Sequence, residues 1–243
     1  MTSIENTVQL SHPSDAAPAR RFTLALYAAT LFFSALLIFA IQPMFTKMVL
    51  PKLGGSPSVW SVALVVFQSA LFIGYVYAHM LVRWLKPGRA AIVHLVFLAA
   101  VAATLPLGIA KGFGTPPEYG VTLWLAGLFF VSIGLPFIAL AASAPLLQSW
   151  FTATGHKQAA NPYVLYAASN LGSFAALIAY PFLIEPLLSL KTQISLWSAG
   201  FFALAGLVAV AGFFAASRTT DAAQPDAETG ARPSALQIGR AHV

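Results

Sequence analysis

Six long apolar runs alternate along the chain with short segments rich in proline, glycine and charge. Each run has about 20 residues or a few more, and a helix rising about 1.5 Å per residue needs roughly that length to cross the hydrocarbon layer of a bilayer. The pattern predicts an all-α fold: a polytopic membrane protein with a bundle of about six transmembrane helices. The predicted spans are 22–41, 59–82, 90–110, 121–147, 163–184 and 194–216.

Prolines and glycines predict where these helices are interrupted. The segment 42–58 holds three prolines and the pair Gly54 and Gly55, so we expect a loop there. The fourth span contains Pro136 and Pro145, which lack the backbone N–H that a helix needs. We expect these two prolines to kink the fourth helix or to end it early.

Composition supports lipid rather than water as the solvent. Hydrophobic residues make up 58% of the chain and charged residues 8%, whereas soluble domains carry about 25% charged residues. The net charge of +6 comes from basic residues in short loops, without the lysine- or arginine-rich stripe of a nucleic-acid-binding protein. We therefore expect the lipid bilayer, and no nucleic acid, as a partner. Cysteine is absent, which excludes disulfides and thiolate metal sites.

The distribution of lysine and arginine predicts the orientation. With the N-terminus inside, the inner segments hold eight of these residues and the outer loops four, with Arg240 left out. Because cytoplasmic loops carry the excess of positive charge, both ends of this multi-pass protein are predicted to lie in the cytoplasm.

The polar ends divide the chain into four parts. Residues 1–21 are predicted to be a cytoplasmic N-terminus, 22–216 the transmembrane domain, and 217–236 a disordered linker rich in Ala, Asp, Glu, Thr and Pro. The final segment, 237–243, resembles the translation of a sequencing-adapter oligonucleotide. We expect it to be non-native and the natural chain to continue further; the alternative is a genuine short tail.

Polar residues inside the predicted spans are candidates for function, because such groups are costly in a bilayer. Gln68, Phe72, Tyr75 and His79 share one face of the second helix. This face either lines a cavity or bonds to neighbouring helices, with His79 at the inner interface beside Arg83.

The fifth span has a similar face formed by Tyr166, Asn170, Ser173 and Tyr180, with Ser169 adjacent. Asn170 and Ser173 either face a substrate path or bond to other helices. A row of small residues lies on the other side and permits close helix packing. This row consists of Ala168, Gly172 and Ala176.

Charged residues near the outer ends of the helices are further candidates. Glu185 is the only acid between Glu118 and Asp221, and it either attracts a cation or pairs with a lysine, namely Lys47, Lys52 or Lys191. Gln42 precedes a proline at the predicted outer end of the first helix, as Glu185 does at the end of the fifth, so these ends could form a weak internal repeat.

The expected loop 42–58 is basic through Lys47 and Lys52, so it either binds anionic headgroups or is a solvated connection. Gly54 and Gly55 do not form a phosphate-binding loop, because no strand precedes them and no Gly-Lys-Ser/Thr string follows. His94 lies in an otherwise apolar span. A single histidine there more often forms a hydrogen bond to another helix than binds a ligand.

No enzyme signature is present. The spacings of a zinc site, a nucleophile elbow and a dinucleotide fingerprint are missing, and carboxylates are too few for a paired acid and base. We therefore expect no catalytic residue, no metal site and no cofactor in this chain.

Several strings together resemble one family, the bacterial fused transporter-like (major facilitator-like)/spermidine synthase proteins, over residues 22–216. The strings are 41–48, 50–60, 74–79, 143–151, 165–173 and 180–186. The resemblance implies a bacterial inner-membrane location and a cytoplasmic spermidine-synthase-like domain after the linker, with an S-adenosyl-binding glycine motif and aminopropyltransferase acids. This chain contains neither, so no catalytic role is carried over to its residues.

The resemblance implies a membrane domain that anchors such a polyamine-biosynthetic enzyme, with a possible transport path along Gln68, His79, Asn170 and Glu185. The scarcity of carboxylates disfavours transport of a multiply positive polyamine by this domain alone. The alternatives are a small stand-alone permease acting as a homodimer of six-helix units and a purely structural membrane subunit.

Overall fold

The computed structural model describes residues 13–53 and 57–221. In these ranges the regular structure is entirely helical, and five helices are long and apolar enough to cross a membrane. The helices are α1 (Pro13–Leu53), α2 (Pro57–Trp84), α3 (Pro87–Ala102), α4 (Val121–Ala153), α5 (Tyr163–Ala179), α6 (Glu185–Leu187) and α7 (Leu190–Asp221). A short 3₁₀ helix, η1 (Lys157–Ala160), follows α4, and a π-helical turn, η2 (Tyr180–Ile184), joins α5 to α6.

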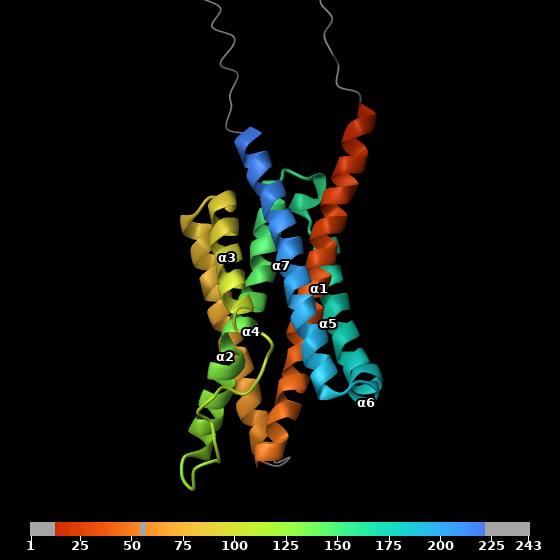
Figure 1. Cartoon of the computed structure of the whole chain (residues 1–243). Helices are drawn as coiled ribbons and strands as arrows, with labels where there is room; N and C mark the ends of the chain where they lie inside the picture. Colours follow the sequence, from red (N-terminus) through yellow and green to blue (C-terminus); the bar gives the residue numbers. More distant parts are fainter. Residues whose placement is uncertain (1–12, 54–56, 222–243) are drawn as a thin grey trace, which may run out of the picture.

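The long helices run roughly along one axis and pass back and forth between the two ends of the bundle (Figure 1). The start of α1 and the end of α7 lie at the same end, here called the terminal end. The turns between α2 and α3 and between α4 and α5 also lie there, whereas α6 lies toward the opposite end. The predicted all-α membrane bundle is confirmed.

The first predicted loop is wrong. Helix α1 continues through Pro43 and Pro51 to Leu53, so Gln42, Lys47 and Lys52 lie on a helix. In an apolar setting a helix tolerates proline where neighbouring groups satisfy the backbone. Each proline removes one amide donor, the one that would bond to the carbonyl four residues earlier, and the helix continues on either side of it. On the same stretch the Gln42 side chain donates to the Ile38 carbonyl at 3.4 Å, and the Thr46 hydroxyl donates to the Gln42 carbonyl at 2.8 Å.

Gly54 and Gly55 lie outside the described residues. The same is true of the segment 237–243 and of the linker 217–236 beyond Asp221, up to which α7 remains helical.

The third span is also shorter than predicted. Helix α3 ends at Ala102, so its 16 residues do not meet the length of a spanning helix, and residues 103–120 continue without regular structure. Hydrogen bonds to α4 and α1 hold this segment in place. The Ala110 amide donates to Ser132 Oγ of α4 at 3.0 Å, and Lys52 Nζ of α1 donates to the carbonyls of Phe113 and Gly114 at 3.1 Å each.

Neither proline ends helix α4 early, as Pro136 and Pro145 both lie inside a helix of 33 residues. This helix packs against α1, α2, α3 and α7, and is the most fully buried of the five long helices. A cluster of aromatic rings from three helices forms part of the core, with Phe45 of α1 against Phe129 at 5.3 Å and Phe67 of α2 against Phe137 at 5.1 Å between centroids.

Small residues set the spacing between helices, as the sequence predicted for α5. Gly172 and Ala176 are buried, and a Cβ on Gly172 would collide with the Phe32 carbonyl group of α1, whose carbon would be 2.9 Å away. Gly74 of α2 is equally close to α4, where an added Cβ would lie 2.7 Å from the Cβ of Ala141. These contacts let α1 and α5, and α2 and α4, pack backbone against backbone.

Helix α7 is joined to α1 by two buried hydrogen bonds far apart along the axis. The Tyr27 hydroxyl donates to the Ala211 carbonyl at 2.7 Å, and the Trp197 indole donates to the Leu37 carbonyl at 2.9 Å. Each bond satisfies a polar group of an aromatic side chain within the apolar bundle.

The outer surface of the bundle is strongly apolar. Large hydrophobic side chains are exposed on every long helix, among them Phe72, Leu123, Phe174 and Phe213, whose exposed fractions are 68%, 81%, 61% and 71%. Soluble monomers rarely expose so much contiguous apolar surface, so this perimeter is the surface that lipid covers. The protein is therefore a multi-pass membrane protein.

Candidate functional site

A cleft with a volume of about 210 Å³ lies between α1, α2 and α4, with one residue of α5 at its edge. It brings together three residues that the sequence singled out, Gln42, Gln68 and Tyr75. The sequence had assigned Gln42 to a helix end and the other two to a polar face, without connecting them. The remaining polar wall residues are Ser34 and Ser169.

The geometry of helices α1 and α2 explains why these side chains meet. Gln68 and Tyr75 are seven residues apart, two turns along one face of α2, and that face lies opposite Gln42 of α1. Tyr75 is 49% exposed, so the cleft opens at the surface of the bundle.

The chemistry of the cleft is neutral. Its polar groups are amides and hydroxyls, and no ionisable acid or base other than the Tyr75 phenol lines it. The apolar wall includes Ile38, Phe67 and Phe137. Such a lining can hold water or an uncharged molecule by hydrogen bonds, but it offers no fixed charge to a cation.

The other predicted path residues lie elsewhere. His79 is exposed one turn beyond Tyr75, and Asn170 is exposed on α5. The Ser173 hydroxyl donates to the Asn170 carbonyl at 2.8 Å, so it is satisfied within its own helix. Ser169, which the sequence placed only as a neighbour of this face, is the α5 residue that reaches the cleft.

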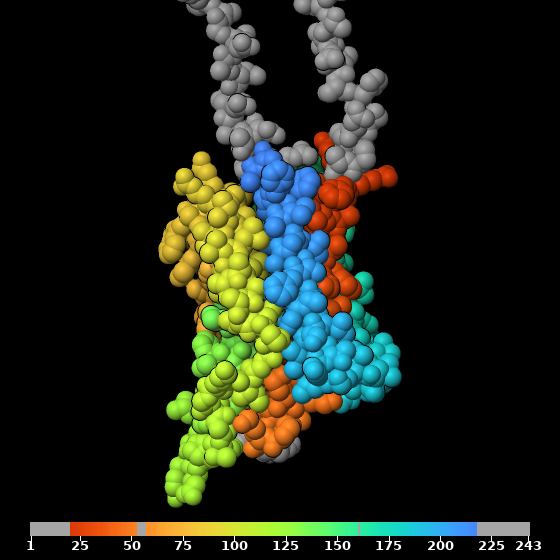
Figure 2. Space-filling view, viewed as in Figure 1, coloured from red at the N-terminus to blue at the C-terminus, as the bar shows by residue number. Residues whose placement is uncertain are grey.

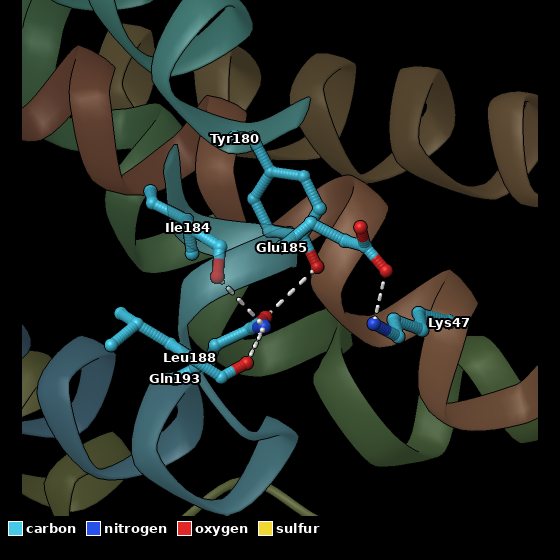
Figure 3. Close-up of polar contacts among 6 residues, drawn as sticks. All are labelled: Lys47, Tyr180, Ile184, Glu185, Leu188 and Gln193. Atoms are coloured by element: carbon cyan, nitrogen blue, oxygen red, sulfur yellow. Dashed lines mark hydrogen bonds and ion pairs between the residues drawn. The ribbon is translucent and has the colours of Figure 1, made fainter. Parts of the chain in front are cut away.

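Glu185 forms an ion pair with Lys47, one of the three lysines that the sequence offered as partners (Figure 3). The pair links α6 to α1 over 138 positions in the sequence. Both side chains remain partly exposed, at 38% for Lys47 and 43% for Glu185. The pair neutralises the acid that sequence reasoning had considered for attracting a cation.

Beside this pair, Gln193 holds the turn between α5 and α7 (Figure 3). Its side-chain oxygen accepts from the Tyr180 hydroxyl at 2.9 Å, and its nitrogen donates to the carbonyls of Leu188 at 2.9 Å and Ile184 at 3.4 Å. The Ile184 carbonyl also accepts from the Leu188 amide at 3.0 Å, so the side chain of this buried residue adds a second donor there and fastens the start of α7 to the residues that follow the π-turn. Sequence reasoning missed Gln193, since it lies one residue before the predicted span.

A second polar cluster surrounds His94, which is fully buried. Its Nε2 lies 3.1 Å from Ser143 Oγ of α4, and the Ser143 hydroxyl donates to the Ala139 carbonyl at 2.9 Å. Nε2 is therefore the donor to Ser143, so His94 is an interhelical partner as the sequence predicted, but only through this one of its two ring nitrogens.

Three polar atoms in this cluster lack a hydrogen-bond partner among the described residues: His94 Nδ1, the Tyr77 hydroxyl and the Trp150 indole nitrogen. The Tyr77 and Trp150 rings both neighbour the imidazole, with centroids 5.9 Å and 6.4 Å away. Sequence reasoning did not identify Tyr77 or Trp150, because an isolated aromatic residue in an apolar run is normally a packing residue.

Within the described ranges, no group of three or more histidine, cysteine, aspartate or glutamate side chains is arranged to hold a metal ion. Comparison of the chain with models of protein families, with curated proteins and with solved structures gave no match.

Proposed function

We propose that the helical bundle is a multi-pass anchor in the bacterial inner membrane, and that it holds a spermidine-synthase-like domain at the cytoplasmic face. The observation that carries this proposal is the position of the chain's described ends. The start of α1 and the end of α7 lie at the same end of the bundle (Figure 1), so a domain joined to α7 would lie on the same side as the N-terminal segment.

Charge supports the cytoplasmic placement of the terminal end. Seven lysine and arginine residues of the described chain lie in segments at this end, against four in segments at the opposite end. An excess of positive charge is typical of the cytoplasmic side. The seven are Arg20, Arg21, Arg83, Lys86, Arg89, Lys157 and Arg218, and the four are Lys47, Lys52, Lys111 and Lys191.

The polar groups favour anchoring over polyamine transport. A polyamine is multiply positive, and we expect a path for it through an apolar bundle to offer fixed negative charge in place of the lost water. The cleft has no carboxylate, and Glu185 is already paired with Lys47. The cleft volume of about 210 Å³ is also below the range of about 300–1,000 Å³ that is usual for ligand pockets.

Transport by reconstituted protein tests this proposal. The chain is inserted into liposomes, and uptake of labelled spermidine is compared with that of empty liposomes and of liposomes holding the Gln68→Leu variant. The anchor proposal predicts uptake equal to that of empty liposomes for both proteins. Saturable uptake by the wild-type chain, lost in the variant, would overturn it.

The partner domain is tested at the level of the gene. The reading frame that follows the codon of Leu236 in the source genome is sequenced. A continuation encoding an aminopropyltransferase-like domain is expected, and a stop codon shortly after this position would contradict the proposed partner.

A second candidate is a small permease for an uncharged solute, acting as a dimer of six-helix units. The specific observation in its favour is the cleft, where Gln42, Gln68 and Tyr75 converge. A liposome swelling assay with small neutral solutes distinguishes the two. Swelling that depends on Gln68 would favour the permease. Liposomes that do not swell would favour the anchor.

A further inference from the structure

A groove with a volume of about 560 Å³ runs between α3 and α7 toward the terminal end of the bundle. These helices lie side by side on the face seen in Figure 2, with α3 in yellow and α7 in blue. They approach closely at two points, where a Cβ on Gly212 would lie 2.7 Å from the Cβ of Ala91 and a Cβ on Gly88 would lie 3.1 Å from the Cβ of Ala216. The groove therefore has a floor of small residues from both helices.

The two parts of the groove differ in chemistry. Lys86 and Arg89, both exposed, line it where α3 begins, and no acidic residue lines it. Neither basic side chain has an ion-pair partner among the described residues. The groove thus presents two positive charges that no acid of residues 13–53 or 57–221 pairs with.

Farther along α3 and α7 the walls are apolar. Ile92 and Phe213 are 63% and 71% exposed, and Leu95 and Ala209 complete this part. Since α3 begins at the terminal end and runs inward, the charges lie near the membrane surface and the apolar walls lie deeper. This order matches an amphiphile with an anionic head and a hydrocarbon tail.

We propose that this groove binds a phospholipid with an anionic headgroup, its phosphate beside Lys86 and Arg89 and one acyl chain along Ile92, Leu95 and Phe213. A second copy of the chain fits less well, because a symmetric contact through this face would bring the same basic residues together. A zwitterionic lipid lacks the net negative charge that complements the two cations. The inference stands independently of the proposed anchoring function.

Native mass spectrometry of the whole chain in neutral detergent tests the site, with dioleoyl phosphatidylglycerol or dioleoyl phosphatidylcholine added at equal concentration. Each basic residue near an anionic lipid surface contributes a factor of about five in affinity. With two such residues, wild type should therefore retain phosphatidylglycerol on the order of 25-fold better than phosphatidylcholine. Equal retention of the two lipids would overturn the proposal.

Matched variants locate the site. The double variant Lys86→Gln/Arg89→Gln should lose most of the preference for phosphatidylglycerol. Arg83→Gln, which removes an exposed charge near the same end but outside the groove, should keep it. A preference that survives the double variant, or that Arg83→Gln weakens equally, would contradict this location.

A third variant tests the apolar part without changing charge. Ala209→Phe places a ring in the groove and should lower retention of phosphatidylglycerol while the unfolding temperature without added lipid is unchanged. Retention equal to that of wild type in this folded variant would show that the acyl chain lies elsewhere and would overturn the proposal.

Discussion

Lys47 of α1 and Glu185 of α6 form an ion pair that connects the first helix of the bundle with the turn between the last two long helices. The two residues lie 138 positions apart, so the pair reports on the assembled fold rather than on local structure. The pair also neutralises Glu185, which is the only acid between Glu118 and Asp221.

A double-mutant cycle with Lys47→Met and Glu185→Gln should measure a coupling energy of about 0.5–1 kcal/mol, because both side chains are partly exposed and solvent screens them. The free energy of unfolding in detergent is the quantity to compare. Lys191→Met, which removes a lysine with no ion pair in the described part of the chain, should change it little. Independent effects of the Lys47 and Glu185 substitutions would contradict the pair.

Gly172→Ala should destabilise the bundle by about 3 kcal/mol or more, because the new methyl group collides with the Phe32 backbone and no side-chain rotation relieves the contact. Gly206→Ala is the matched control on α7, where nothing lies within 4 Å of the added methyl group. This control should be neutral or stabilising by up to about 1 kcal/mol. Thermal unfolding in detergent checks both, and a similar effect of the two substitutions would argue against close packing of α1 on α5.

Gln193→Leu should cost about 1–3 kcal/mol, because it leaves the Tyr180 hydroxyl and the Leu188 carbonyl without their partner and removes the second donor to the Ile184 carbonyl. Combining it with Tyr180→Phe should recover part of this loss, since the hydroxyl that lost its acceptor is then removed as well. Unfolding by denaturant measures the three variants. Additive losses in the combined variant would contradict the hydrogen bond between the two side chains.

His94→Leu should change stability by less than about 1 kcal/mol, because the apolar side chain removes an unsatisfied nitrogen and Ser143 keeps its bond to the Ala139 carbonyl. His94→Ala leaves a cavity in the buried core and should lower the free energy of unfolding by about 2–5 kcal/mol. Both variants are compared with wild type by thermal unfolding. A large loss in His94→Leu would mean that Nδ1 has a partner, such as a buried water, that the protein depends on.

The number and approximate position of the helices could be predicted from the sequence, because a helix surrounded by lipid needs a run of about 20 apolar residues, and such runs are visible in the sequence. Helix ends could not. Proline-rich residues 42–53 looked like a loop, yet α1 stays helical there, because each proline removes only one amide donor and an apolar setting favours the helix over an open backbone. Residues 103–110 looked helical, yet tertiary contacts such as that of Ala110 with Ser132 hold them outside a helix.

The candidate site was predictable only in part. The periodicity of α2 identified Gln68 and Tyr75, but which helix faces them depends on packing between distant segments, so Gln42 and Ser169 could not be joined to them in advance. The same periodicity places His79 on this face of α2, but the cleft does not reach that turn, and the alternative role of His79 at the inner interface beside Arg83 stays a prediction. Gln193 acts on a π-turn that has no clear sequence signature.

Cysteine accessibility tests the central claim most directly, that lipid surrounds the bundle and both chain ends face the cytoplasm. The chain has no native cysteine, so Tyr119→Cys, in an 88% exposed position of the segment 103–120, and Gln158→Cys, in η1 at the terminal end, each carry one thiol. A membrane-impermeant maleimide should label Tyr119→Cys in intact cells and Gln158→Cys only after permeabilisation, with both proteins in the membrane pellet. Labelling of Gln158→Cys in intact cells, or recovery of the proteins in the soluble fraction without detergent, would contradict the account.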